Sequence, residues 1–391
     1  MGGILGLKRL RYVFFLVWII CLVAGRGSIS YADDADEPHI AAQSAILIEA
    51  STGRVIWEKQ ADDRHYPASM TKIMTALLGL DIISPHTEIF ISPEAAATED
   101  CPLGIRAGDC LTAEELLTGM MMVSDNGAAV AVAEQIDGST AEFARRMNEK
   151  AQELGMEHTH FSNPNGLTDP NHYSTARDMA RLAKYAMENP SFRRMVSQRE
   201  RVIRWTLPRN GHLLVLNTNK LLGSYGGTTG IKTGWTSAAG GCLAASARRN
   251  GVELIAVLMQ TSGPEERFTD AEKMLSYGFS HVRMVRGMAK EKISRRVWVK
   301  GGTQASTWLH PVSDIDYPLI HGEDPGKYSL RYDIPRVMTA PIRKGEVAGR
   351  ILICYEGQPV GSVDMTADSV SQGFSIASWL VQLFEGLLVR L

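Results

Sequence analysis

The pattern of apolar and polar positions in the first two thirds of the chain predicts one mixed domain over residues 40–282. Two β-rich runs at 45–49 and 54–58 flank a glycine-containing turn and predict a hairpin. Helical patterns fill the centre of the domain, and strand patterns return at 242–247 and 253–259 before a last helical stretch. We therefore expect an α/β (α+β) sandwich, in which both ends of the domain contribute to one antiparallel sheet and the middle forms a helical subdomain.

A different pattern follows over residues 283–368. Short strand candidates alternate there with turns rich in Gly, Pro and Asp, which indicates a small all-β domain. The titratable side chains of this region form no recognisable constellation. A role as a spacer or docking module is therefore favoured for it.

The first 32 residues have the pattern of an export signal. A basic cluster at 8–11 precedes an apolar run at 12–24, and small residues then lead to Ala32. We expect cleavage after Ala32 and an extracytoplasmic location for the remaining chain. The alternative is an uncleaved N-terminal anchor.

Residues 372–391 are expected to form an amphipathic helix that associates with a membrane surface. Between 374 and 391 the polar residues recur at spacings of 3, 4 and 3, which leaves a thin polar stripe. A helix of these 18 residues would be about 27 Å long, which is marginal for crossing a bilayer. A position in the membrane interface is favoured, and a helix packed on the β domain is the alternative.

Composition narrows the functional classes. The 391 residues are 45% hydrophobic and 21% charged with a net charge of -2, as in an ordinary globular protein. Lys and Arg are spread along the chain, so nothing points to a nucleic-acid partner.

The cysteines suggest one disulfide and no metal. Cys21 belongs to the predicted signal, whereas Cys101 and Cys110 bracket a short loop. In an oxidising compartment these two could pair, and such a disulfide would stabilise the fold by roughly 2–3 kcal/mol. Neither a Cys-x-x-Cys pair nor a His-Glu-x-x-His motif is present, so we expect no metal site and no cofactor.

The first candidate for chemistry is Ser69-x-x-Lys72, at the start of an apolar helical run. Residues three apart share one helix face, so the lysine can reach the hydroxyl. Ser69 could simply cap the helix, but capping does not explain a lysine in the first turn, where the helix dipole disfavours a cation. A buried lysine with a lowered pKa can instead act as the general base for a serine nucleophile.

Two further short elements follow in a fixed order. Ser124-Asp125-Asn126 lies at a turn between helical patterns, and Lys232-Thr233-Gly234 lies in a strand pattern. Each element is weak evidence alone, but the three in this order on helix, loop and strand are the element set of penicillin-recognising serine enzymes.

The residue types fit acyl transfer. Ser69 would attack a carbonyl, Lys72 would accept its proton, and Ser124 would relay that proton to the leaving amine. Lys232 would hold a substrate carboxylate and help to lower the pKa of Lys72. The remaining expected roles are substrate hydrogen bonds from Asn126 and Thr233, close backbone approach at Gly234, and an oxyanion hole from the N–H groups of Ser69 and Trp235.

The chain resembles the low-molecular-mass penicillin-binding D-alanyl-D-alanine carboxypeptidases, serine peptidase family S11. The resemblance covers 40–282 well and 283–368 loosely. It implies a β-lactamase-like fold and removal of the terminal D-Ala from peptidoglycan stem pentapeptides through an acyl-enzyme on Ser69. It also implies β-lactams as covalent inhibitors, a role in cell wall biosynthesis, and a C-terminal anchor on the outer face of the cytoplasmic membrane. The segments that carry it are Tyr66-Pro-Ala-Ser-Met-Thr-Lys72, Phe161-Ser-Asn-Pro-Asn-Gly-Leu167, His172-Tyr-Ser-Thr-Ala-Arg-Asp178 and Gly230-Ile-Lys-Thr-Gly-Trp-Thr236.

The sequence departs from the family pattern at two positions. Thr218 stands in Asn217-Thr218-Asn219 where some members carry Arg, and Trp235 stands where some carry His.

Two other functions are alternatives. A class A β-lactamase is one alternative, but the Glu-x-x-x-Asn element that it needs for deacylation is missing. A catalytically silent peptidoglycan-binding protein is the other, and the complete set of reactive residues argues against it.

Overall fold

The computed structural model describes residues 37–373, so the predicted signal sequence and all but the first two residues of the predicted terminal helix lie outside the described part. The chain divides into two units, Met1–Glu37 and Pro38–Leu391, and every element below belongs to the second. No helix within residues 37–373 is long and apolar enough to cross a bilayer.

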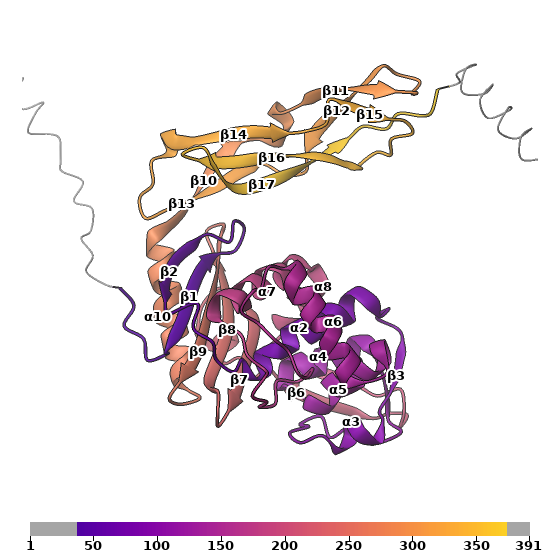
Figure 1. Cartoon of the computed structure of the whole chain (residues 1–391), viewed down its shortest axis with the longest axis vertical. Coiled ribbons are helices and arrows are strands. Elements are labelled where there is room, and N and C mark those ends of the chain that lie inside the picture. The colour runs from indigo at the N-terminus through magenta and orange to yellow at the C-terminus, as the bar shows by residue number, and fades with distance from the viewer. Residues whose placement is uncertain (1–36, 374–391) are drawn as a thin grey trace, which may run out of the picture. The chain divides into compact units, whose positions relative to one another are not determined.

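A five-stranded antiparallel sheet forms the centre of the first domain (Figure 1). The strand order β2-β1-β9-β8-β7 leaves β7 on an edge, and Ala45 of β1 pairs with Leu258 of β9. The expected pairing of the two ends of the domain is therefore confirmed. The strands are β1 (Ser44–Glu49), β2 (Val55–Lys59), β7 (Thr228–Thr236), β8 (Gly240–Arg249) and β9 (Val252–Thr261).

Helices cover both faces of this sheet. In β1, Leu47 packs with the buried side chains of α10 (Glu266–His281), while Ile46 and Ile48 face the helical subdomain, because successive strand residues point to opposite faces. At the centre of the subdomain lies α2 (Lys72–Ile82), whose first eight residues are all buried. The other helices are α3 (Pro93–Ala97), α4 (Ala113–Val123), α5 (Asn126–Asp137), α6 (Thr140–Glu153), α7 (Ala176–Glu188), α8 (Pro190–Val196) and α9 (Leu221–Ser224).

Two small hairpins that the sequence patterns did not predict complete the subdomain. They are β3 (Glu88–Phe90) with β4 (Cys110–Thr112), and β5 (Glu200–Arg204) with β6 (His212–Leu216). The second leads directly into the Asn217-Thr218-Asn219 segment, and so brings that segment to the active site.

The suggested disulfide between Cys101 and Cys110 is not formed, since all four cysteines of the described residues are free. Cys110 is buried in β4 opposite Phe90. The thiol of Cys101 donates to the Thr98 carbonyl and accepts from the N–H of Gly127. Each sulfur is therefore held in a different packing environment.

The second domain is all β, as expected. A two-stranded sheet of β10 (Val282–Met288) and β13 (Ile315–Ile320) accompanies a six-stranded sheet in the order β14-β16-β17-β12-β11-β15. One face of the larger sheet is buried through residues such as Val297, Leu309 and Met365. Its strands are β11 (Arg295–Lys300), β12 (Ser306–Pro311), β14 (Tyr328–Asp333), β15 (Val337–Thr339), β16 (Val347–Tyr355) and β17 (Gln358–Ala367), with short 3-10 turns at Lys290–Lys292 and Pro325–Lys327.

Candidate active site

Ser69 lies in a 3-10 turn, Ala68–Thr71, immediately before α2. The hydroxyl of Ser69 does not cap the turn or the helix, because neither start has a side-chain cap bond. Instead it accepts a hydrogen bond from Nζ of Lys72 at 2.8 Å. The tight turn thus directs the serine side chain toward the lysine rather than toward the helix N-terminus.

Lys72 is fully buried, which is unusual for a lysine. Besides Ser69, its Nζ donates to Oδ1 of Asn126 at 2.6 Å and to the backbone oxygen of Asn165 at 2.7 Å. Burial lowers the pKa of Lys72 to about 7, and the nearby carboxylate of Asp125 opposes the shift. A large share of this amine is therefore neutral near neutral pH, as a general base requires.

The turn between α4 and α5 supplies Asn126. Ser124 ends α4 in the left-handed conformation at φ 66, and Asp125 caps α5 by accepting from the N–H of Ala128 at 2.8 Å. Asn126 begins α5, and its Nδ2 donates to the Glu99 carbonyl at 2.9 Å. That bond turns Oδ1 of Asn126 toward Lys72. Ser124 lines the same cleft as Ser69.

Gly234 sets how closely the edge strand β7 approaches the serine turn. A Cβ on Gly234 would lie 3.1 Å from the backbone nitrogen of Ser69 and 3.1 Å from the Pro67 oxygen. We expected this glycine to admit a substrate backbone. In the structure, the missing side chain of Gly234 instead allows the turn that contains Ser69 to pack closely against β7, which brings the Ser69 N–H beside that strand.

Lys232 is buried on β7, and its Nζ donates to the Thr233 carbonyl at 2.8 Å. Burial lowers the pKa of Lys232 well below its usual value, and the cations of Lys72 and Arg267 add to the shift. We expected Lys232 to help lower the pKa of Lys72. In the structure, burial is instead the main cause of the low Lys72 pKa.

Arg267 is a site residue that the sequence patterns did not reveal. It lies in the first turn of α10, lines the cleft and hydrogen-bonds to the Gly234 carbonyl. Its Nε is buried without a hydrogen-bond partner in the described part of the chain. The available signal was a cation in the first turn of α10, where a helix favours the opposite charge.

Thr218 stands at the position where the family resemblance implies an arginine in some members. Its hydroxyl lies 2.7 Å from the hydroxyl of Thr233, and its N–H donates to the Met122 carbonyl at 2.9 Å. Thr218 therefore fixes Thr233 but brings no charge to the cleft. Of the two nearby cations, Lys232 and Arg267, Arg267 is the one that lines the cleft, although most of its surface is buried.

The loop that contains Asn165 packs against the serine turn. Gly166 has φ +89, and a Cβ there would lie 2.0 Å from the Ala68 oxygen. His172 makes a second contact, with Nε2 at 2.8 Å from the Thr71 hydroxyl while Nδ1 accepts from the N–H of Ser162. Burial lowers the pKa of His172 to about 4, so the ring is neutral, and its proton lies on Nε2 toward Thr71.

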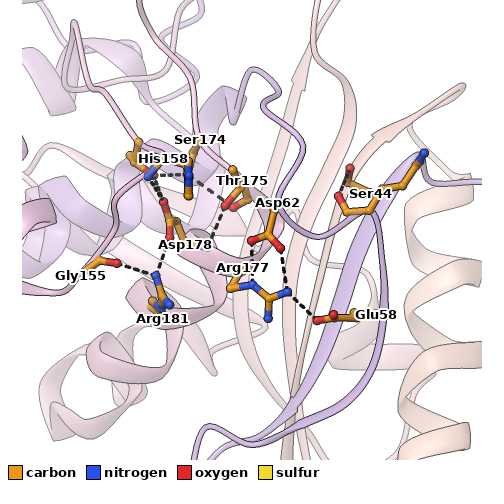
Figure 2. A network of polar contacts seen from close by, with 12 residues as sticks. Ser44, Glu58, Asp62, Gly155, His158, Ser174, Thr175, Arg177, Asp178 and Arg181 are labelled. Atoms are coloured by element: carbon orange, nitrogen blue, oxygen red, sulfur yellow. Dashed lines mark hydrogen bonds and ion pairs between the residues drawn. The ribbon is translucent and has the colours of Figure 1, made fainter.

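Polar contacts at the start of α7 hold this loop in place, as Figure 2 shows. Asp178 accepts from the N–H of His158 and the hydroxyl of Thr159, both at 2.9 Å. Arg177 bonds to Asp62 and Glu58 on the other side of the helix. The loop is thus anchored to α7 and the β2 region before it reaches Lys72.

The site opens into a cleft of about 300 Å³. A serine hydrogen-bonded to a buried lysine, beside the free edge of an antiparallel sheet, is the arrangement of a serine acyl-transfer enzyme. The residues that line the cleft are Ser69, Asp100, Pro102, Val123, Ser124, Asn126, Gly166, Leu167, Thr218, Thr233, Gly234, Trp235, Thr236 and Arg267.

Comparisons with known proteins agree with this class. The family model for D-alanyl-D-alanine carboxypeptidases matches residues 31–263, and the model for the C-terminal domain of penicillin-binding protein 5 matches 285–371. The chain belongs to the D-alanyl-D-alanine carboxypeptidase family, peptidase S11, which confirms the resemblance inferred from its motifs.

Individual relatives span most of the chain. D-alanyl-D-alanine carboxypeptidase DacF of Bacillus subtilis is 34% identical over 94% of this chain and 96% of its own. The structure of penicillin binding protein 5 from Haemophilus influenzae matches with a TM-score of 0.64 and 28% identity, covering 86% of this chain and 99% of that chain. The Streptomyces K15 DD-transpeptidase structure matches with a TM-score of 0.60 and 31% identity, covering 63% of this chain and 99% of that chain.

Proposed function

We propose that this chain is a serine D,D-carboxypeptidase that removes the terminal D-Ala from peptidoglycan stem pentapeptides through an acyl-enzyme on Ser69. The observation that carries the proposal is the 2.8 Å contact between Oγ of Ser69 and Nζ of Lys72, with Lys72 fully buried. The family match supports the reaction class and the role in cell wall metabolism.

Acylation begins with neutral Lys72. Its amine takes the proton of the Ser69 hydroxyl as Oγ attacks the penultimate D-Ala carbonyl, and the N–H groups of Ser69 and Trp235 stabilise the oxyanion. Ser124 passes the proton to the departing amine of the terminal D-Ala. A water then hydrolyses the ester with Lys72 again as base, which restores the Ser69 hydroxyl.

The substrate carboxylate binds at the Arg267 end of the cleft. The buried Nε of Arg267 lacks a partner in residues 37–373, and a carboxylate satisfies a guanidinium by paired hydrogen bonds. Lys232 and the hydroxyl of Thr233 add to this site. The bound substrate carboxylate is an anion, so it favours the charged form of Lys232. The peptide lies along the free edge of β7 as an added strand, with Asn126 holding its amide.

The domain plan follows the same proposal. Residues 1–32 direct export, 40–282 form the catalytic domain, 283–368 form the β domain, and 372–391 lie on the membrane interface. The enzyme then acts on the outer face of the cytoplasmic membrane, and β-lactams acylate Ser69.

One experiment tests the function. The purified protein and its Ser69→Ala variant are incubated with a labelled penicillin and, separately, with a pentapeptide that ends in D-Ala-D-Ala. Release of D-Ala with a long-lived penicilloyl adduct, both lost in the variant, is the expected result. Rapid penicillin turnover without D-Ala release would indicate a β-lactamase. Peptide binding without D-Ala release or adduct would indicate a silent binding protein.

A further inference from the structure

The outer face of the six-stranded β-domain sheet carries two exposed tryptophans. In β11, Val297 is buried while Trp298 is 57% exposed, and in β12, Leu309 is buried while Trp308 is 48% exposed. Side chains alternate between the faces of a strand, so both tryptophans project from the face opposite the domain core. Exposed tryptophans that share one face usually mark an interaction surface.

Strand register places two exposed valines on the same face. Val337 of β15 pairs directly with Trp298. Val347 of β16 pairs with Thr366, which in turn pairs with His310, two residues after the second tryptophan. Directly paired residues project from the same side of a sheet. Four of the five adjacent strands from β16 to β15 therefore carry an exposed apolar residue on this face, and β17 carries Thr366 between them.

The charge around the tryptophans is mostly positive. The segments 295–311 and 334–345 contain no Asp or Glu. The acidic residues at the border of the face are Glu346, Asp364 and Asp368, and the carboxylate of Asp368 lies 3.5 Å from Nε2 of His310. The guanidinium of Arg296 lies 5.2 Å from the ring of Trp298.

Arg296 and Lys300 share the face of Trp298 by strand alternation, whereas Arg295 pairs with the buried Leu309 and projects from the other face. The other exposed basic residues of the two segments are Arg336, just before β15, and Arg343 and Lys344, just after it.

The described chain ends at the border of this face. The N–H of Gly373 donates to the carbonyl of Gly301 at 2.8 Å, and Gly302 forms a bridge with Gln372. Gly301 follows β11 directly, three residues or roughly 10 Å from Trp298. The described chain therefore ends next to the strand that carries Trp298, and the apolar sequence 374–391 follows it.

We propose that this face of the β domain is a second membrane contact, which lies on an anionic phospholipid surface. Trp298 and Trp308 enter the interface, where an amphipathic ring is most stable, and the basic residues meet the headgroups. The long stems of Arg296 and Lys300 allow their charges to reach headgroups beside the inserted rings. This proposal rests on the membrane association of the terminal segment proposed above. Together, the two membrane contacts would restrict the tilt of the β domain on the bilayer.

Vesicle binding of the full chain tests the contact. Binding is measured to vesicles of phosphatidylcholine alone and of phosphatidylcholine mixed with phosphatidylglycerol. The double variant Trp298→Ser/Trp308→Ser is expected to raise the Kd for the anionic vesicles at least about tenfold. A matched variant, Ile82→Ser/Phe90→Ser, removes two exposed apolar side chains of the catalytic domain and should leave the Kd unchanged. D-Ala release from a soluble peptide, unchanged in both variants, shows that they are folded.

A stop codon after Gly373 separates this contact from the terminal segment. If the truncated chain loses binding while the tryptophan variant binds anionic vesicles as the parent does, the contact is refuted and the terminal segment stands. If the truncated chain retains binding that depends on phosphatidylglycerol and on the tryptophans, the contact stands without the terminal segment.

Two other occupants of the face would overturn the proposal. One is a glycan, shown by weaker binding of the tryptophan variant to isolated peptidoglycan with unchanged vesicle binding. The other is a second copy of the chain, shown by a dimer in sedimentation that the variant loses, again with unchanged vesicle binding.

Discussion

The backbone oxygen of Asn165 lies 2.7 Å from Nζ of Lys72, so a loop nearly a hundred residues away in sequence supplies the third hydrogen bond to the lysine. Because the acceptor is a carbonyl rather than a carboxylate, it orients the amine without the charge that would raise its pKa strongly. The position of this loop is therefore part of the catalytic geometry.

Substitution of Gly166 tests the loop. We expect Gly166→Ala to lower the rate of Ser69 acylation by penicillin at least about 100-fold, because its Cβ would meet the Ala68 oxygen and displace the serine turn. Stopped-flow or gel-based measurement of acylation gives this rate. Gly138→Ala is the matched control, since Gly138 also has positive φ but nothing within 4 Å of an added Cβ. Equal acylation rates for the two variants would contradict the role of the loop.

Arg267 should determine recognition of the free carboxylate. For a peptide that ends in D-Ala-D-Ala, we expect Arg267→Gln to lower kcat/KM by about 10- to 100-fold, since it removes a charge-assisted hydrogen bond. A peptide whose terminal carboxylate is amidated should lose much less on the same substitution. Arg283→Gln, at an exposed position on β10, is the control. An equal loss for both peptides would show that Arg267 only supports the fold.

His172 should act as a positioning residue through Thr71. We expect His172→Gln to slow acylation about tenfold or more, because the hydrogen bond to Thr71 holds the turn between Ser69 and Lys72. The pKa of His172 is about 4, so the ring stays neutral across the working range and the pH dependence of the remaining activity should not move. A shift of the pH profile in the variant would instead assign the titration to His172.

Free cysteines lead to a simple measurement. Cys101, Cys110, Cys242 and Cys354 are all unpaired. The denatured exported protein should therefore react with four equivalents of a thiol reagent, and a reductant should leave its Tm unchanged. Two reactive thiols and a Tm that falls on reduction would instead support a disulfide between Cys101 and Cys110.

Much of the fold was predictable because it depends on local patterns. The hairpin at 45–49 and 54–58, the strands β8 and β9, and the all-β texture after 283 each have a clear period or turn signal. The short hairpin β5–β6 did not, since half of its residues face solvent and the apolar run 213–216 of β6 does not alternate with polar residues.

The site was predictable only where side chains act within short motifs. Ser69, Lys72, Asn126 and Lys232 stand in recognisable triplets, and the structure brings them to one place. The contribution of Asn165 is a backbone carbonyl, which every residue has, so no residue type could reveal it. Arg267 comes from a helix beyond the sheet, and only the packing of α10 on β8 and β9 carries it to the cleft.

The central claim is that neutral Lys72 activates Ser69, and the pH dependence of penicillin acylation tests it most directly. Only the deprotonated amine can accept the Ser69 proton, and the pKa of Lys72 is about 7. The second-order acylation rate should therefore rise about tenfold per pH unit below pH 7 and level off above it. Lys72→Arg keeps a cation that cannot be deprotonated, and it should lower the plateau rate by roughly 10³-fold. A parental rate that does not change between about pH 5 and 8, or a Lys72→Arg variant that acylates as fast as the parent, would contradict the account.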